Sequence, residues 1–191
     1  MAAVSSGVSL TTNYFMNNFY ASNRSVIKSG ARNDYTKLEL SYKDSRALTR
    51  AAKRLLKNDY GSATDEKDET ISATTRSALT AFIDTYNNTV DSSKTSSDHD
   101  TKYQLKKMKA YLNKYSDDLE HIGISMESGG KLKINEDLLK MAKNSKVRKI
   151  FSSDQEFSKH FYKLSKQTHT AVESDIYSQI NGKGLHVNIA L

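Results

Sequence analysis

The sequence predicts an all-α fold: an elongated antiparallel helical bundle or coiled coil of about four long helices, with a small β-hairpin near residues 124–134. The chain of 191 residues contains no proline and only 8 glycines, which suits long uninterrupted helices and argues against a turn-rich β-sandwich. Apolar residues recur at three- and four-residue spacing over most of the chain, which is the period of an amphipathic helix. Helices with heptad seams pack at shallow angles, and this predicts the bundle.

The two ends of the chain depart from this pattern. Residues 1–32 are rich in serine, asparagine and threonine, and their apolar residues have no clean period. We therefore expect a mobile N-terminal arm there, with a short helix at 12–22. The helical bundle domain is expected over 33–182. The C-terminal tail, 183–191, alternates weakly between apolar and polar residues, as a strand does.

The first two helices are predicted from the residues at their ends. Asp34 is the expected N-cap of a helix that runs to about Asn58, and Gly61 closes it. An acidic run at 65–69, after Thr64, predicts the start of the second helix, because acidic side chains favour the positive end of the helix dipole. The buried stripe of that helix is expected to consist of Ile71, Ala78, Leu79, Phe82, Ile83, Tyr86 and Val90.

The third helix, after a polar loop at 91–100, has the clearest periodicity in the chain. Its apolar residues are spaced 3-4-3-4-3, which is a heptad seam. This seam consists of Leu105, Met108, Leu112, Tyr115, Leu119 and Ile122. Gly123 is expected to end the helix, and the alternation on both sides of Gly129 and Gly130 predicts the hairpin.

Two further helices are expected before the tail. Asn135 is the expected N-cap of a short helix over 136–143, and a short connection with apolar residues at 147–151 follows it. Asp154 is the expected N-cap of the last long helix, which the glycines after residue 181 bring to an end. The seam of this helix consists of Phe157, Phe161, Leu164, Val172, Ile176 and Ile180.

Four segments in the middle of the chain carry a family resemblance. Residues 81–88 read Ala-Phe-Ile-Asp-Thr-Tyr-Asn-Asn, and residues 119–124 read Leu-Glu-His-Ile-Gly-Ile. Residues 130–139 contain Gly-Lys-Leu-Lys-Ile-Asn, and residues 144–151 read Asn-Ser-Lys-Val-Arg-Lys-Ile-Phe. In this order, the four segments resemble the conserved helical region of the flagellar filament-cap proteins, also called hook-associated protein 2. Ser145 stands where that family has proline.

The resemblance implies a non-enzymatic structural or assembly protein. Cap proteins assemble at the filament tip and guide flagellin into place, and this chain is similar to their helical leg alone, because it is too short to hold their β-rich head. The implied partners are a second copy of the chain or flagellar components such as flagellin and the hook-associated proteins. The residues expected to carry these helix–helix contacts, within the chain or between copies, are Phe82, Ile83, Tyr86, Leu105, Met108, Leu112, Leu119 and Ile122.

No catalytic, cofactor-binding or metal-binding residue is predicted. The chain has no cysteine, which removes disulfides, thiolate metal sites and cysteine nucleophiles. The five histidines show no HExxH spacing, and no Walker loop, GxSxG or GxGxxG motif occurs. The segment 98–100, Asp-His-Asp, lacks the glycine turn of a calcium loop. His160 follows Glu156 by four residues, which we interpret as an exposed polar pair.

The alternative hypothesis is a basic helical module that binds nucleic acid or another polyanion. The net charge is +7, and the chain is net positive over 1–60 and 102–166 but net negative over 61–101. This alternation also fits neighbouring segments that pack with complementary charge. Lysines accompany tyrosines along the third helix, a combination that binds phosphates and stacks on bases. The basic and tyrosine residues concerned are Arg50, Lys53, Arg54, Lys57, Lys102, Tyr103, Lys106, Lys107, Lys109, Tyr111, Lys114 and Tyr115.

The first ten residues have neither a basic region nor a continuous apolar core, so we expect no secretory signal peptide. The apolar runs are far shorter than the roughly 20 residues that a membrane helix needs. We expect a soluble bacterial protein that is cytoplasmic as made. Export to the flagellum without a cleaved signal peptide stays open at this point.

Overall fold

The computed structural model describes residues 32, 35–61, 69–94 and 96–182, so the predicted tail and all of the predicted arm except Arg32 lie outside the described residues. Within these ranges the chain is mostly helical with one small antiparallel sheet, which confirms the predicted class. The elements are α2 (Lys37–Leu56), α3 (Ala73–Lys94), α4 (His99–Lys114), α5 (Ser116–Glu120), β1 (Ile124–Met126), β2 (Leu132–Ile134), α6 (Glu136–Met141), α7 (Asn144–Phe151) and α8 (Glu156–Gly182).

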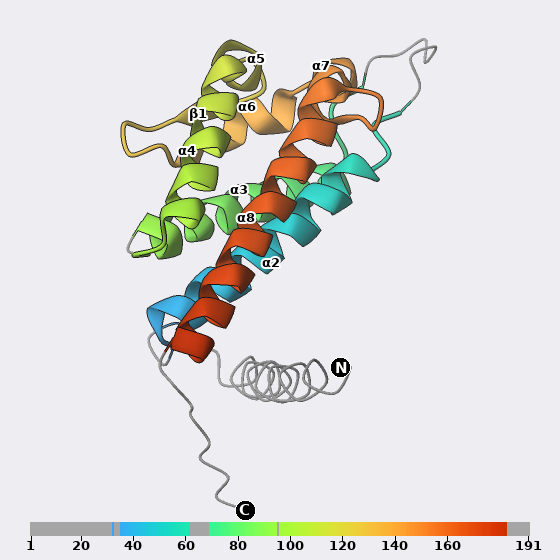
Figure 1. Ribbon diagram of the computed structural model, residues 1–191. Helices are drawn as coiled ribbons and strands as arrows, with labels where there is room; N and C mark the ends of the chain where they lie inside the picture. The colour runs from blue at the N-terminus through green and yellow to red at the C-terminus, as the bar shows by residue number, and fades with distance from the viewer. Residues whose placement is uncertain (1–31, 33–34, 62–68, 95, 183–191) are drawn as a thin grey trace, which may run out of the picture.

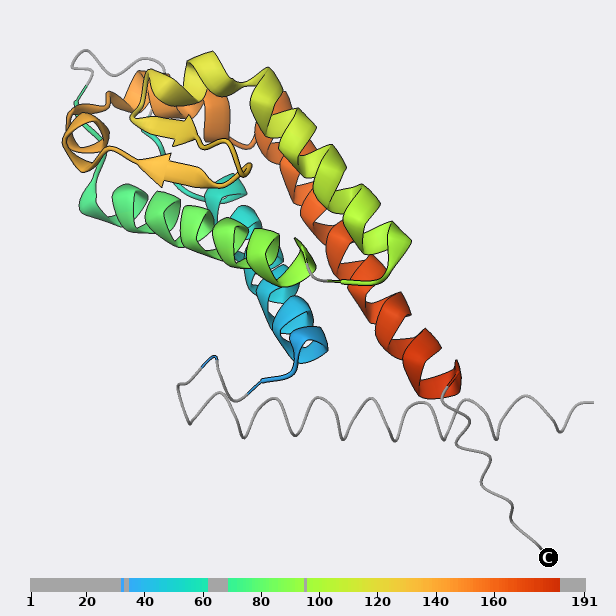
Figure 2. The same cartoon turned by 90° about the vertical axis from the view of Figure 1, so that its left-hand side faces the viewer.

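The longest helix, α8, lies at the centre of the arrangement. It runs antiparallel to α2 on one side and to α4 on the other (Figure 1). Helix α3 packs on α2 but lies oblique to α4 and α8, as Figure 2 shows. The hairpin and the short helices α5, α6 and α7 gather at the end of the molecule where α8 begins. This end therefore contains all the short elements, whereas α2 and α8 continue to the opposite end as a pair.

Helix α2 begins with a capping box two residues after the expected cap. The Thr36 hydroxyl accepts a hydrogen bond from the Glu39 backbone N–H (3.3 Å), and the Glu39 carboxylate accepts one from the Thr36 N–H (2.9 Å). This reciprocal pair satisfies two backbone donors at the helix start. The prediction of Asp34 as the N-cap is therefore wrong. The helix ends at Leu56, and Gly61 turns the loop beyond it with φ +76°.

Helix α3 begins at Ala73, so the acidic run does not form its first turn. Of that run, Glu69 lies in an extended segment before the helix, and the other acidic residues lie outside the described part of the chain. Thr70 pairs as a β-bridge with Lys143, and the Asn144 N–H donates to the Glu69 carbonyl oxygen (2.9 Å). This pairing with a distant segment holds residues 69–71 extended, and therefore the helix dipole argument placed the helix start too early.

The heptad seam of the third predicted helix is divided between two helices. Tyr115, with φ −110° and ψ 17°, ends α4 and precedes α5, so the single helix predicted over this seam is wrong. Gly123 follows α5 with φ +84°, a conformation that favours glycine. The hairpin is confirmed: β1 pairs antiparallel with β2, and Ile124 lies opposite Ile134.

The elements after the hairpin begin close to the predicted positions. The Asn135 side chain accepts a hydrogen bond from the Leu138 N–H (3.1 Å), which confirms it as the N-cap of α6. The apolar connection at 147–151 is instead part of helix α7. Helix α8 begins at Glu156, and the Asp154 carboxylate accepts hydrogen bonds from side chains of neighbouring residues, so Asp154 is not its N-cap.

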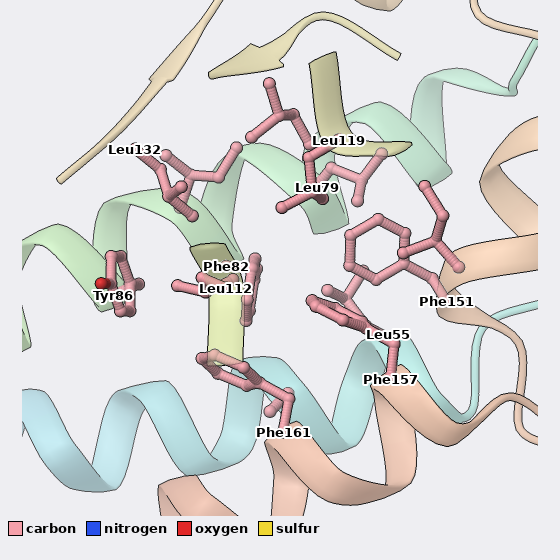
Figure 3. Packing of buried hydrophobic residues seen from close by; sticks show 14 of the residues in the cluster. Leu55, Leu79, Phe82, Tyr86, Leu112, Leu119, Leu132, Phe151, Phe157 and Phe161 are labelled. Carbon is pink, nitrogen blue, oxygen red and sulfur yellow. The ribbon is translucent and has the colours of Figure 1, made fainter. Parts of the chain in front are cut away.

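The hydrophobic core is centred on aromatic rings from α3, α7 and α8 (Figure 3). The Phe82 ring lies 5.0 Å from that of Phe161, and the Phe151 ring lies 5.2 Å from that of Phe157, both nearly edge to face. Such aromatic pairs stabilise a core beyond the apolar area that they bury. A second, smaller cluster at the far end of the α2–α8 pair consists of Tyr42, Val172 and Ile176.

Among the described residues, no helix is long and apolar enough to cross a membrane.

Candidate functional site

The eight residues predicted to carry helix–helix contacts all lie inside one chain. Each has at most 6% of its surface exposed, and all belong to the main core cluster. Those from the predicted second helix lie on α3, and the others lie on α4, on α5 or directly after α5. They pack against one another and against α7 and α8, so their side chains are covered before any second copy binds. A surface for a partner must therefore be sought elsewhere.

Two neighbouring residues of α3 fasten the hairpin to the core. The Tyr86 hydroxyl donates to the Gly130 carbonyl oxygen (2.7 Å) in a buried contact. Asn87 uses both ends of its amide on Leu132: its Nδ2 donates to the Leu132 carbonyl, and its Oδ1 accepts from the Leu132 N–H, both at 2.8 Å. An asparagine that binds one peptide unit in this way fixes the position of the strand as a further strand would. Burial also raises the pKa of Tyr86, so its hydroxyl stays protonated as a donor.

The glycines on each side of the hairpin allow close contacts that a side chain would prevent. A Cβ on Gly123 would lie 2.9 Å from the Asn135 carbonyl oxygen and from the Leu139 backbone nitrogen. A Cβ on Gly130 would meet the aliphatic part of Lys109 at 2.8 Å. Lys109 crosses over this turn, and its Nζ donates to the Gly129 carbonyl (3.0 Å). Burial lowers the pKa of Lys109, and the nearby positive charge of Lys94 adds to this effect.

The most prominent surface feature on the long helices is a groove between α4 and α8, of about 560 Å³. Its walls include Asp100, Tyr103 and Gln104 from α4 and Lys163, Lys166 and Gln167 from α8. Tyr103 is 51% exposed, which makes it one of the few large hydrophobic side chains at the surface of the described chain. The Nζ of Lys107 lies 5.4 Å from the centre of the Tyr103 ring, in a cation–π contact. We call this feature the α4–α8 groove.

The lysines of α4 do not form one binding face. Lys107 lies beside the α4–α8 groove, Lys109 binds the hairpin turn, and Lys114 lies near the Tyr115 ring. Tyr111 and Tyr115, which sequence reasoning paired with these lysines, pack with Phe157 at the edge of the core. Only Tyr103 of the three tyrosines is exposed enough to stack on a ligand. The basic residues predicted on α2, Arg50, Lys53, Arg54 and Lys57, are all exposed.

Positive charge continues from the groove across α8 to α2. His169 of α8 lies between the two helices: its Nδ1 is 3.0 Å from the Ser45 hydroxyl, and its ring is 5.1 Å from that of Tyr42. Burial lowers the pKa of His169; Glu173 opposes this shift, and the positive charges of Arg46 and Arg50 reinforce it. The guanidinium groups of α2 and the lysines of α8 thus border the same face of the molecule.

The remaining histidines and acidic groups give no evidence of a catalytic or metal centre in the described part of the chain, where no cluster of three or more metal-ligating side chains occurs. Asp98, at the start of the Asp-His-Asp segment, is the N-cap of α4: its carboxylate accepts from the Thr101 N–H (2.6 Å). His160 packs on Tyr111, with ring centres 4.3 Å apart. These groups have structural roles that account for their positions.

Sequence reasoning identified part of this surface. It selected Tyr103 and Lys107, but it did not bring Lys163 and Lys166 to them, because the two pairs are far apart in the chain and meet only when α4 packs on α8. It also included Asn87 in a motif without recognising its role. A helical asparagine directly after a buried tyrosine was the signal available. Comparison of the chain with known families, with curated proteins and with solved structures finds no match.

Proposed function

We propose that the protein is a non-enzymatic assembly module that resembles the helical leg of a flagellar filament cap and acts through protein–protein contacts. In this proposal α2, α3, α4 and α8 serve as the four long helices of an elongated antiparallel bundle. The short elements brace one end of it. The partners are further copies of the chain or flagellar components such as flagellin and the hook-associated proteins.

The observation that supports this proposal best is that the four resembling segments form one structural unit. Tyr86 and Asn87, from the first segment, bind the backbone of Gly130 and Leu132 in the third. The Gly123 carbonyl, from the second segment, accepts a hydrogen bond from the Asn135 N–H at 2.8 Å. Residues chosen from sequence likeness alone therefore touch one another around the hairpin, as expected if the resemblance reflects a shared local fold.

The eight buried contact residues are consistent with a leg that is rigid before it binds. Since they are occupied inside the chain, binding to a partner falls to the exposed helical faces. Interfaces between proteins are enriched in tyrosine and arginine, because these side chains combine apolar area with polar tips. Tyr103, Arg46 and Arg50 place such side chains on the face that α2, α4 and α8 share.

The test is a binding measurement with the full chain immobilised and purified flagellin and hook-associated proteins of the source organism in solution. Both samples are treated with nuclease, and the measurement is made at physiological salt. We expect saturable binding to at least one of these proteins. Binding to none of them, with the chain shown to be folded by its circular dichroism, would contradict the proposal.

A second candidate function, binding of single-stranded nucleic acid, is favoured by one observation. The exposed Tyr103 has Lys107 on one side and Lys163 and Lys166 in the same groove, and lysines beside an exposed ring can hold phosphates while a base stacks. The test is the fluorescence anisotropy of a labelled oligonucleotide titrated with the protein. Binding that weakens steeply as salt rises would support this candidate, and no change in anisotropy at low salt would contradict it.

A further inference from the structure

We propose that the α4–α8 groove is a docking site for the acidic run of a second copy of the chain, residues 65–69. This inference rests on the proposed assembly function and names the contact that it uses. The run reads Asp-Glu-Lys-Asp-Glu and carries four acidic groups within five residues. The groove offers lysine side chains of opposite charge and an exposed tyrosine, so the two surfaces are complementary.

The charges of the groove are available to a partner. The ion pairs within the described part of the chain use Lys131 with Asp91 and Lys140 with Asp137, but they include none of Lys107, Lys163 and Lys166. Asp100 lines the α4 N-terminal end of the groove and disfavours an anion there. We therefore expect the acidic run to lie toward Lys163 and Lys107. Exposed ion pairs are individually weak, so several must form together to hold the contact.

The run cannot reach the groove of its own chain. It is tethered on both sides, since the Gly61 carbonyl accepts a hydrogen bond from Arg148 (3.3 Å) and the Glu69 carbonyl accepts one from Asn144, both on α7. The residues between these anchors, 62–68, extend about 13 Å out and back. The groove begins at Lys163, about 10 Å along α8 from its first turn, and it lies on the side of α8 away from α2 (Figure 1). Crossing the helix adds about 10 Å more.

Docking between copies follows from this geometry. The acidic run and the groove are different surfaces, so each chain binds one neighbour with its groove and another with its run. Contacts of this head-to-tail kind close into rings or continue as open filaments, whereas a two-fold dimer pairs one surface with itself. An assembly protein that grows or caps a filament requires contacts of this type.

Sedimentation analysis of the full chain with two sets of charge reversals tests this inference. The groove variant carries Lys163→Glu and Lys166→Glu, and the run variant carries Asp65→Lys, Glu66→Lys and Asp68→Lys. The matched control, Lys53→Glu with Lys57→Glu, reverses two exposed lysines of α2 outside the groove. Thermal melting first establishes that each variant is folded as the unaltered chain is.

We expect the unaltered chain at low salt to sediment above its monomer mass of 21.4 kDa and to dissociate as salt rises. The groove and run variants should each associate at least about tenfold more weakly, and the control should not change. Mixing the two variants should restore association, because each then offers the charge that the other lacks. Recovery in the mixture is a result that general loss of folding or solubility does not produce.

Several results would overturn the inference. Association of the groove variant equal to that of the unaltered chain would do so, as would a mixture that stays monomeric. If the control alone loses association, copies meet through α2, and the assembly function stands while the groove contact fails. A chain that is monomeric at low salt, but whose groove variant loses binding to an oligonucleotide, would assign the groove to nucleic acid instead.

Discussion

The two halves of α8 are held in the molecule by different means. Its first half packs Phe157 and Phe161 against aromatic rings of α3 and α7. Its second half meets α2 through polar groups: the Thr49 hydroxyl donates to the Ser165 carbonyl (3.1 Å), and the Ser45 hydroxyl lies 3.0 Å from His169. Burial of one phenylalanine stabilises a fold by about 1.5–3 kcal/mol, whereas one hydrogen bond contributes a net of about 0.5–1.5 kcal/mol. The aromatic half should therefore unfold last.

This difference also explains which half the sequence revealed. Apolar side chains at helical spacing are a direct signal of burial, and the aromatic half was predicted residue by residue. The buried hydroxyls of Ser45, Ser165 and Thr168 resemble any exposed serine or threonine in the sequence. Their small volume lets α2 and α8 approach closely, but only the folded structure shows their partners.

The largest effect is expected from a charge in the apolar half. Leu112 is fully buried on α4, so Leu112→Asp should abolish cooperative unfolding, because an unpaired carboxylate there has no partner and no water. Circular dichroism during heating measures this. Lys106→Asp on the exposed side of the same helix is the control and should retain a sharp transition. A cooperative transition for both variants would show that Leu112 is not part of the core.

Truncation of an aromatic side chain should come next. Phe161→Ala should lower the free energy of unfolding by about 3–5 kcal/mol, since it leaves a cavity among Phe82, Tyr86 and Phe157. Urea titration measures the change. In the polar half, Ser165→Ala should cost far less, because its hydroxyl bonds only within its own helix, to the Tyr162 carbonyl. Equal losses for the two variants would contradict the contrast between the two halves of α8.

A smaller and more local effect is expected at the hairpin. Asn87→Ala removes both hydrogen bonds to Leu132 and leaves the buried peptide groups of that residue unpaired, at a cost of about 1–3 kcal/mol. Hydrogen exchange at the Leu132 amide should accelerate more than exchange in α8. Asn88→Ala, one residue further along α3, is the matched control and should leave the Leu132 amide protected.

The hairpin also shows where prediction from sequence ended. Gly123, Gly129 and Gly130 with the alternating residues around them predicted both strands, because local turn chemistry determines a hairpin. The start of α3 was missed, because a bridge between Thr70 and Lys143 overrides a local preference for helix. The α4–α8 groove was half found for the same reason: residues on one helix share a visible period, but the pairing of two helices is a tertiary property.

The smallest effect, and the one that best isolates the polar half, is a dependence on pH. Burial lowers the pKa of His169 in the folded chain, so the unfolded chain binds a proton more readily than the folded chain does. The free energy of unfolding should therefore fall as the pH is lowered through the ordinary histidine pKa of 6.5. His169→Gln keeps a polar side chain but removes the titrating group, and it should lose less stability between pH 7.5 and pH 5.5 than the unaltered chain. His121→Gln, at an exposed position, should follow the unaltered chain. Because His169 contacts Ser45 and Tyr42 of α2, exchange at amides in the far half of the α2–α8 pair should increase at low pH before exchange in the aromatic half does. An equal response of the two halves would mean that α8 unfolds as one unit despite the two kinds of packing along it.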